Sequence, residues 1–579
     1  MKYRERWFTP PKSDEIPIDL SDPGICTISG LFRQDITVNG TLRGTVTYIP
    51  ENFRQNNRAI VAAIPSGSEP DLFLESSGLG ELADKYGLLI TMPEQEEYRW
   101  ERAKDAALLN AVYKKLQAKD YYVVMQDAIY LMGFGDGADI AQEAARTMTS
   151  EWSGLATFGN FQDDLFMDTS SCTVDDADSQ IGEMYISAKR AQLPVWMLIE
   201  SETAAEKRLI DYWNRENQTQ AEPVFGADGT LIFLPSNLKK TWKTNDDNIS
   251  QTRVTKGFGM EDLSSELLEK VWLYVGAARR HRGYGDKILR YFRAPLENGA
   301  TYHRVTVDGF GREWYEYVPA RVAAEGKPVP LVCAFHGRGS NGETFFDVTD
   351  MSLVAEERGF IALFPTADIY QIREKGFRGV RLWNGNWNGK KLDSLPFIRE
   401  MIRDVRSRLP VDPERIYACG QSSGGFMAAT CALGAGDLFA AVAPWSGYTC
   451  PRLEGDFRYL KDRWFEGGPV PIQLMVGKKD REFGLNSVYP LGGESRLEIF
   501  IRFILEEYRL DPVPKQYSCP PVDYTVWENR DHVPMLTVGL VNDMPHANYP
   551  EESWISYDQF LCKFRMSEHG VRYYMGRPI

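Results

Sequence analysis

The stretch Ile416-Tyr-Ala-Cys-Gly-Gln-Ser-Ser-Gly-Gly425 decides the fold of the region around it. Its apolar start is typical of a buried strand, and the run 426–433 that follows can form a helix. Glycine on both sides of Ser422 permits a turn so sharp that strand and helix nearly touch. This G-x-S-x-G pattern makes Ser422 a candidate nucleophile and the N–H of Ser423 a candidate oxyanion donor.

The same order of patterns occurs twice along the chain. Each copy alternates strands and helices, which is typical of a mostly parallel sheet covered by helices on both faces. We therefore predict tandem α/β units over residues 1–295 and 296–579, with a boundary near Leu296–Gly299 and an insertion around 378–391 in the second copy. The matched segments lie at offsets between 269 and 287, and they begin at Ile36, Leu82, Ile129 and Pro194 and at Val305, Val354, Ile416 and Pro471.

Composition excludes several classes of protein. The 579 residues carry 66 Lys and Arg against 81 Asp and Glu, and 12% are aromatic, which is a globular and acidic balance that does not favour nucleic acid. No apolar segment reaches the roughly 20 residues of a membrane span, and the first residues lack the apolar stretch of a secretion signal. We expect a cytoplasmic protein without a membrane partner.

Eight cysteines without a C-x-x-C pair indicate neither a disulfide framework nor a zinc cluster. We expect reduced, structural thiols. The chemistry outlined below needs no metal and no organic cofactor.

A serine hydroxyl needs a base to take its proton and a carboxylate to orient that base. Asp480 follows the apolar run 471–476 and is the expected acid, with Glu482 and Asp543 as alternatives. The base must come from the histidines after Asp480. His546 is preferred because it lies between an expected last strand over 535–541 and an expected last helix over 551–564, whereas His532 and His569 are expected at the surface.

The second oxyanion donor is expected in the loop after the apolar run 330–335. That loop reads His336-Gly-Arg-Gly339, a version of the His-Gly loop that donates a backbone N–H to the oxyanion. We assign this role to the N–H of Arg338. His336 is interpreted as a structural hydrogen-bonding residue and not as the base.

The second half resembles the polyhydroxybutyrate depolymerase-type esterases, which include feruloyl and acetyl esterases of the α/β-hydrolase fold. The resemblance covers about residues 300–565 and implies tandem α/β-hydrolase units. Trp383-Asn384 resembles the family's tryptophan loop beside the ester, so that His336, Gly337, Trp383 and Asn384 form the expected substrate-binding set. The resemblance is carried by 331–337 with Asn341, by 397–405 and 411–417, by the elbow with Gly425, and by Met544-Pro-His-Ala-Asn-Tyr-Pro550.

Two departures from that family bear on the substrate. Many members have cysteines where this chain has Arg338 and Leu382. Their absence agrees with a reducing compartment. We therefore expect a soluble ester, such as a hydroxyacyl oligomer or an aromatic ester, in place of an insoluble polymer.

The first half lacks the residues of this chemistry. No histidine precedes His281, Gly135 stands at the serine position, and Thr203 stands opposite Asp480. We predict a degenerate hydrolase domain. Three roles remain open for it: shaping the neighbouring cleft, building an oligomer interface, or supporting stability alone.

Together these residues predict a serine ester hydrolase with one active centre. The catalytic set is Ser422, Asp480 and His546. A serine peptidase or acyltransferase would use the same three residues, and a non-catalytic binding or scaffold protein is the alternative from another class.

Overall fold

The fold is described from a computed structural model. It covers residues 2–12, 15–17, 19–117, 122–161, 172–175, 183–186, 192–236, 245–281, 288–372, 377–383, 394–449, 467–549 and 551–579. Among these residues, no helix combines the length with the apolar character that crossing a bilayer requires.

Each half opens with a two-residue β-hairpin. In the first, Asn39 and Gly40 both have positive φ, and Val38 pairs with Thr41. In the second, Asp308 and Gly309 turn the chain in the same way, and Val307 pairs with Phe310. Asn-Gly and Asp-Gly are the sequences that such turns favour, because both central residues are left-handed.

The described part of the first half forms a ten-stranded sheet whose central six strands are parallel and whose two edges are antiparallel. In spatial order the strands are β1 (Gly30–Val38), β2 (Thr41–Ile49), β4 (Leu89–Pro93), β3 (Asn57–Ala63), β5 (Val124–Phe134), β6 (Leu155–Phe158), β9 (Val195–Ile199), β12 (Thr252–Lys256), β11 (Leu231–Phe233) and β10 (Val224–Phe225).

The second half repeats this strand order one for one, which confirms the predicted tandem α/β architecture. Its described sheet runs β15 (Ala300–Val307), β16 (Phe310–Tyr317), β18 (Ile361–Pro365), β17 (Val329–Phe335), β21 (Val411–Gln421), β22 (Ala441–Trp445), β23 (Ile472–Gly477), β26 (Pro534–Val541), β25 (Val522–Glu528) and β24 (Lys515–Cys519).

Helices cover both faces of each sheet, so the central strands are apolar on both sides. In β3, Ala59, Val61 and Ala63 pack into one core while Ile60 and Ala62 pack into another. The helices of the first half are α1 (Pro70–Ser77), α2 (Leu79–Tyr86), α3 (Arg102–Leu116), α4 (Gly137–Thr147), α5 (Ala204–Glu216) and α6 (Ser265–Val275).

The helices of the second half follow the same plan, and α9, like α2, ends at a left-handed glycine, which closes a helix without steric cost. They are α7 (Ala320–Glu325), α8 (Gly342–Val348), α9 (Met351–Arg358), α10 (Ser394–Arg408), α11 (Ser423–Gly434), α12 (Arg496–Tyr508) and α13 (Glu551–Gln559). The last helix is shorter than predicted. Residues 561–563 form a 3-10 turn, and Phe564 begins β27 (Phe564–Met566), which pairs with β28 (Arg572–Tyr574).

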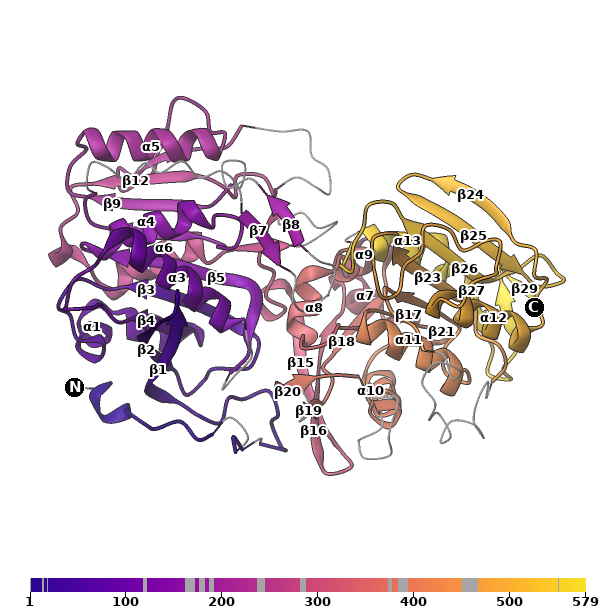
Figure 1. The fold of residues 1–579 in the computed structure, drawn as a ribbon. Helices are drawn as coiled ribbons and strands as arrows, with labels where there is room; N and C mark the ends of the chain where they lie inside the picture. The colour runs from indigo at the N-terminus through magenta and orange to yellow at the C-terminus, as the bar shows by residue number, and fades with distance from the viewer. Residues whose placement is uncertain are drawn as a thin grey trace.

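Two short hairpins lie near the junction of the halves, and Figure 1 labels the one in the second half. The pair β13 (Ala278–His281) and β14 (Ile288–Tyr291) precedes the second half, and β19 (Ile369–Ile372) with β20 (Phe377–Arg381) opens the predicted insertion. Residues 384–391 of that insertion lie outside the described residues.

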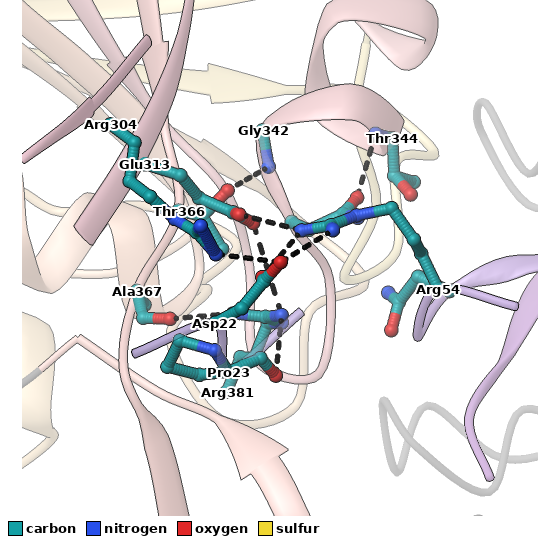
Figure 2. Close-up of polar contacts among 12 residues, drawn as sticks. Asp22, Pro23, Arg54, Arg304, Glu313, Gly342, Thr344, Thr366, Ala367 and Arg381 are labelled. Carbon is teal, nitrogen blue, oxygen red and sulfur yellow. Dashed lines mark hydrogen bonds and ion pairs between the residues drawn. The ribbon is translucent and has the colours of Figure 1, made fainter. Parts of the chain in front are cut away.

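Charged side chains join the two halves. Arg54 binds both Asp22 carboxylate oxygens, at 3.0 and 3.1 Å, and also Glu313 of β16 at 2.9 Å (Figure 2). Arg304 of β15 contacts the same Asp22 at 2.6 Å. The backbones also approach closely, because a side chain at Gly311 would lie 2.0 Å from the carbonyl oxygen of Ser21. The halves therefore pack against each other through residues far apart in sequence.

Candidate active site

Ser422 lies at the turn between β21 and α11, as its motif predicts. Its backbone has φ 54° and ψ −116°, a left-handed conformation that non-glycine residues rarely adopt. A Cβ at Gly424 would lie 1.9 Å from the carbonyl oxygen of Phe335, and one at Gly420 would lie 2.5 Å from the same atom. Only glycine fits at these two positions, and the strained turn lifts Ser422 out of the regular structure.

Asp480 and His546 are hydrogen-bonded to each other. His546 Nδ1 lies 2.7 Å from Asp480 Oδ2, and the other carboxylate oxygen accepts the N–H groups of Glu482 and Phe483 at 3.1 Å. A carboxylate only accepts hydrogen bonds, so Nδ1 carries the proton and Nε2 is left as an acceptor. The other two candidate carboxylates point to solvent: Glu482 is exposed, and Asp543 forms an ion pair with Lys479 at 3.1 Å.

Topology brings the three residues to one edge of the sheet. Ser422 follows β21, Asp480 follows β23 and His546 follows β26, and these strands are parallel neighbours with β22 between the first two. Parallel strands present their carboxyl ends at the same edge, where ligands bind in open α/β sheets. Phe483 packs against both the histidine and the helix that follows the serine. Its ring centre lies 5.4 Å from that of His546 and 5.6 Å from that of Phe426, which is one helical turn after Ser422.

His336 is a structural residue of the His-Gly loop. Its Nε2 accepts the N–H of Ala367 at 2.9 Å, and its Nδ1 donates to the carbonyl oxygen of Gly337 at 2.7 Å. Complete burial lowers the pKa of His336 to about 3, so the ring is neutral. Both ring nitrogens are engaged within the protein. The prediction that His336 binds substrate is therefore wrong for its ring, and the prediction of a structural hydrogen-bonding role is confirmed.

Trp383 is also buried, and its polar groups bind other residues of the site. It is 2% exposed; its indole N–H donates to the carbonyl oxygen of His336, and its backbone N–H donates to the Ser423 hydroxyl. These bonds link the tryptophan segment to the His-Gly loop and to the serine turn. The neighbouring Asn384 lies outside the described residues.

The expected oxyanion donors belong to two segments that meet at the serine turn. Ser423 is the first residue of α11, where backbone N–H groups have no partner within the helix. Arg338 is exposed between two buried glycines, and a Cβ at Gly337 would lie 2.5 Å from the side chain of Gln421 beside Ser422. The Arg338 segment is therefore packed directly against the serine turn.

Three residues that shape this site were missed from the sequence: Phe483, Gln421 and Arg381. Arg381 is buried, donates to the carbonyl oxygen of Ala367 and accepts the N–H of Gly339 on its own carbonyl oxygen. A charged residue two positions before a tryptophan expected in a loop is a weak signal for such a role. The aromatic at 483 gives no local signal, since its partner His546 is far away in sequence.

The first half keeps the turn but has other residues at the matched serine and acid positions. Gly135 stands where the second half has Ser422 and has nearly the same φ, +56°. A Cβ at Gly137 would lie 2.3 Å from the carbonyl oxygen of Ala63, which parallels the contact at Gly424. Thr203, opposite Asp480, caps α5. Among the described residues of the whole chain, no cluster of histidine, cysteine and carboxylate side chains is arranged to hold a metal ion.

Comparison with known proteins points to esterases in the second half. Residues 313–453 match the family model described as esterase PHB depolymerase. The chain is 27% identical over 177 residues to poly(3-hydroxyalkanoate) depolymerase C of Paucimonas lemoignei, covering 28% of this chain and 39% of that protein. It is 29% identical over 140 residues to feruloyl esterase B of Talaromyces funiculosus, covering 24% and 37%. The chain thus spans about two fifths of these relatives' lengths.

A solved structure is also similar to part of the fold. The acetyl xylan esterase from Aspergillus awamori superposes with a TM-score of 0.31 at 17% identity, covering 45% of this chain and 98% of that one.

Proposed function

We propose, from the match of residues 313–453 to the PHB depolymerase esterases, that this chain is a serine carboxylic-ester hydrolase working through an acyl-enzyme on Ser422. The observation that carries the proposal is the hydrogen bond between His546 and Asp480 at the sheet edge where Ser422 occupies its strained turn. This pairing is what an activated serine needs.

The geometry supports a definite order of steps. The Ser422 hydroxyl attacks the ester carbonyl carbon while His546 Nε2 takes its proton, and Asp480 stabilises the imidazolium that forms. The N–H groups of Arg338 and Ser423 stabilise the oxyanion of the tetrahedral intermediate. Its collapse breaks the bond to the alcohol oxygen, which receives the proton from His546. Water then attacks the acyl-enzyme with His546 again as base, and the acid is released.

The relatives' names suggest the substrate class. A depolymerase of hydroxyalkanoate polyesters and a feruloyl esterase both act on carboxylic esters, one of aliphatic hydroxyacids and one of an aromatic acid. We propose a soluble ester of one of these two kinds for this chain.

A fluorophosphonate probe and an ester panel test the proposal. The probe should label the full-length protein at Ser422, and Ser422→Ala should abolish both labelling and turnover while leaving the fold intact. Aryl esters, hydroxybutyrate oligomers and a peptide amide should be compared in one assay, with ester hydrolysis expected. Absence of labelling in the folded wild-type protein would leave only a binding role, and faster cleavage of the amide would indicate a peptidase.

A further inference from the structure

The catalytically empty first half reaches the loop that carries the Arg338 N–H. The amide Nδ2 of Asn56 donates to the carbonyl oxygen of Gly339 at 2.8 Å, and the Asn56 side chain is buried. This bond joins residues 283 positions apart, between the segment that enters β3 and the loop that follows β17. The first half thereby contacts the expected oxyanion loop directly.

Other bonds fix the same loop from within the second half. The carbonyl oxygen of Gly337 accepts from His336 Nδ1 and from the N–H of Ser340. The N–H of Gly339 donates to the carbonyl oxygen of Arg381 at 2.8 Å. The two peptide groups that flank Arg338 are thus held by residues of the second half. Asn56 holds the next peptide group along the loop, through the carbonyl oxygen of Gly339.

The first half also supports Arg381. Its guanidinium donates to the carbonyl oxygen of Pro23 at 3.3 Å and lies 3.9 Å from Glu313, which is itself bound by Arg54 (Figure 2). Burial of Arg381 lowers its pKa, so these acceptors offset the cost of keeping a guanidinium in the interior. Two segments of the first half therefore reach this loop, the one around Asn56 directly and the one around Pro23 through Arg381.

The backbone at Asn56 is shaped for this contact. Its φ is +69°, a left-handed conformation in which asparagine is favoured over most residues, and its own N–H is fixed by the carbonyl oxygen of Val123 at 2.6 Å. The side-chain amide is consequently presented from a rigid base, at low entropic cost.

We propose that Asn56 is a positioning residue for ester hydrolysis, and that the first half serves the second as a fixed support for its oxyanion loop. This inference rests on the proposed function. An oxyanion donor acts only once charge develops on the substrate oxygen, so a loop held less firmly loses transition-state binding and keeps ground-state binding. Displacements near 1 Å are enough to cost catalysis strongly.

The test uses full-length variants. Asn56→Gly removes the amide and tolerates the positive φ, and Asn56→Asp keeps the shape but replaces the donor by an acceptor. Asn57→Ala is the matched control, because the Asn57 amide also donates to backbone carbonyl oxygens, those of Tyr86 and Gly87, but within the first half. For each variant kcat and KM on p-nitrophenyl acetate, the Ki of phenylboronic acid and the melting temperature are measured.

Both Asn56 variants should lower kcat about 10-fold, keep KM within about twofold, and raise the Ki of the boronic acid about 10-fold, since its tetrahedral adduct uses the oxyanion donors. Asn57→Ala should leave all three constants near wild type even if its melting temperature falls.

Unchanged kcat and Ki in folded Asn56 variants, or losses equal to those of Asn57→Ala, would overturn the proposal. Asn56 variants that do not fold beside a folded Asn57→Ala would assign the amide to folding and overturn it as well. An inactive, unlabelled wild-type protein would instead refute the esterase function itself.

Discussion

At the scale of single residues, Ser422 can be compared with Gly135, which occupies the matched turn of the first half. The comparison separates what the fold requires from what the proposed reaction requires. Ser422 and Gly135 have φ of 54° and 56°, so the left-handed turn belongs to the strand–turn–helix unit. Glycine adopts this conformation freely, whereas a serine there costs about 1–2 kcal/mol. The second half retains the costly residue, which is expected where the hydroxyl performs the chemistry.

The role of Asp480 can be measured directly. An asparagine at this position would keep the shape of Asp480 but could not hold the proton on His546 Nδ1, so Asp480→Asn should lower kcat by about 10⁴-fold with little change in melting temperature. Glu482→Gln is the control, because the Glu482 side chain is exposed and its backbone N–H is the group that meets Asp480. A steady-state assay on one aryl ester decides; a larger loss in Glu482→Gln would move the acid to that residue.

At the scale of elements, α8 connects the loop 336–339, the proposed oxyanion loop, to the junction of the halves. It begins immediately after the loop, with the Asn341 side chain accepting the N–H of Thr344 at 2.9 Å. Its Asp347 binds Arg279 of β13 and the N–H of Arg293. Burial raises the pKa of Glu343, in the first turn of α8, to about 7. The charges of Arg58 and Arg54 lower this pKa, and those of Glu313 and Asp347 raise it.

This raised pKa predicts a pH-dependent stability. Between pH 4.5 and 7 the folded chain holds a proton on Glu343 that the unfolded chain has lost, so the free energy of unfolding should fall as pH rises through this window, by at most about 3.4 kcal/mol. Glu343→Gln should remove this contribution, and its melting temperature should fall less than that of the wild type as the pH rises across this window.

The control for this titration is Glu325→Gln, because Glu325 is exposed at the end of α7, where it forms an ion pair with Lys327 at 3.4 Å. Its melting curve should follow the wild type across the same range. Equal slopes for all three proteins would show that Glu343 does not titrate in this window.

At the scale of the molecule, local signals predicted local structure and failed across the junction. The hairpins, the glycine-capped helices and the serine turn each follow from residues within a few positions of one another, so both sheets and the expected sites of Ser422 and His546 could be placed. The bonds from Arg54 to Glu313 and from Asn56 to Gly339 span 259 and 283 positions. No periodicity or spacing encodes such pairs, because their partners are determined by the packing of folded units.

We predict that one substitution would not give the first half this chemistry, because more than the serine is missing there. Gly135→Ser would restore a serine at the turn, where a Cβ would lie 3.3 Å from the Pro65 side chain and the positive φ costs about 1–2 kcal/mol. No histidine precedes His281, so the new hydroxyl has no base from the strands and helices of its own sheet.

Titration with a fluorophosphonate should accordingly give one labelled site per chain in the wild type and still one in Gly135→Ser, with kcat unchanged and a melting temperature lowered by a few degrees. Ser422→Ala combined with Gly135→Ser should label at no site. A second equivalent of label on the Gly135→Ser protein would mean that a base reaches the first turn from elsewhere in the molecule.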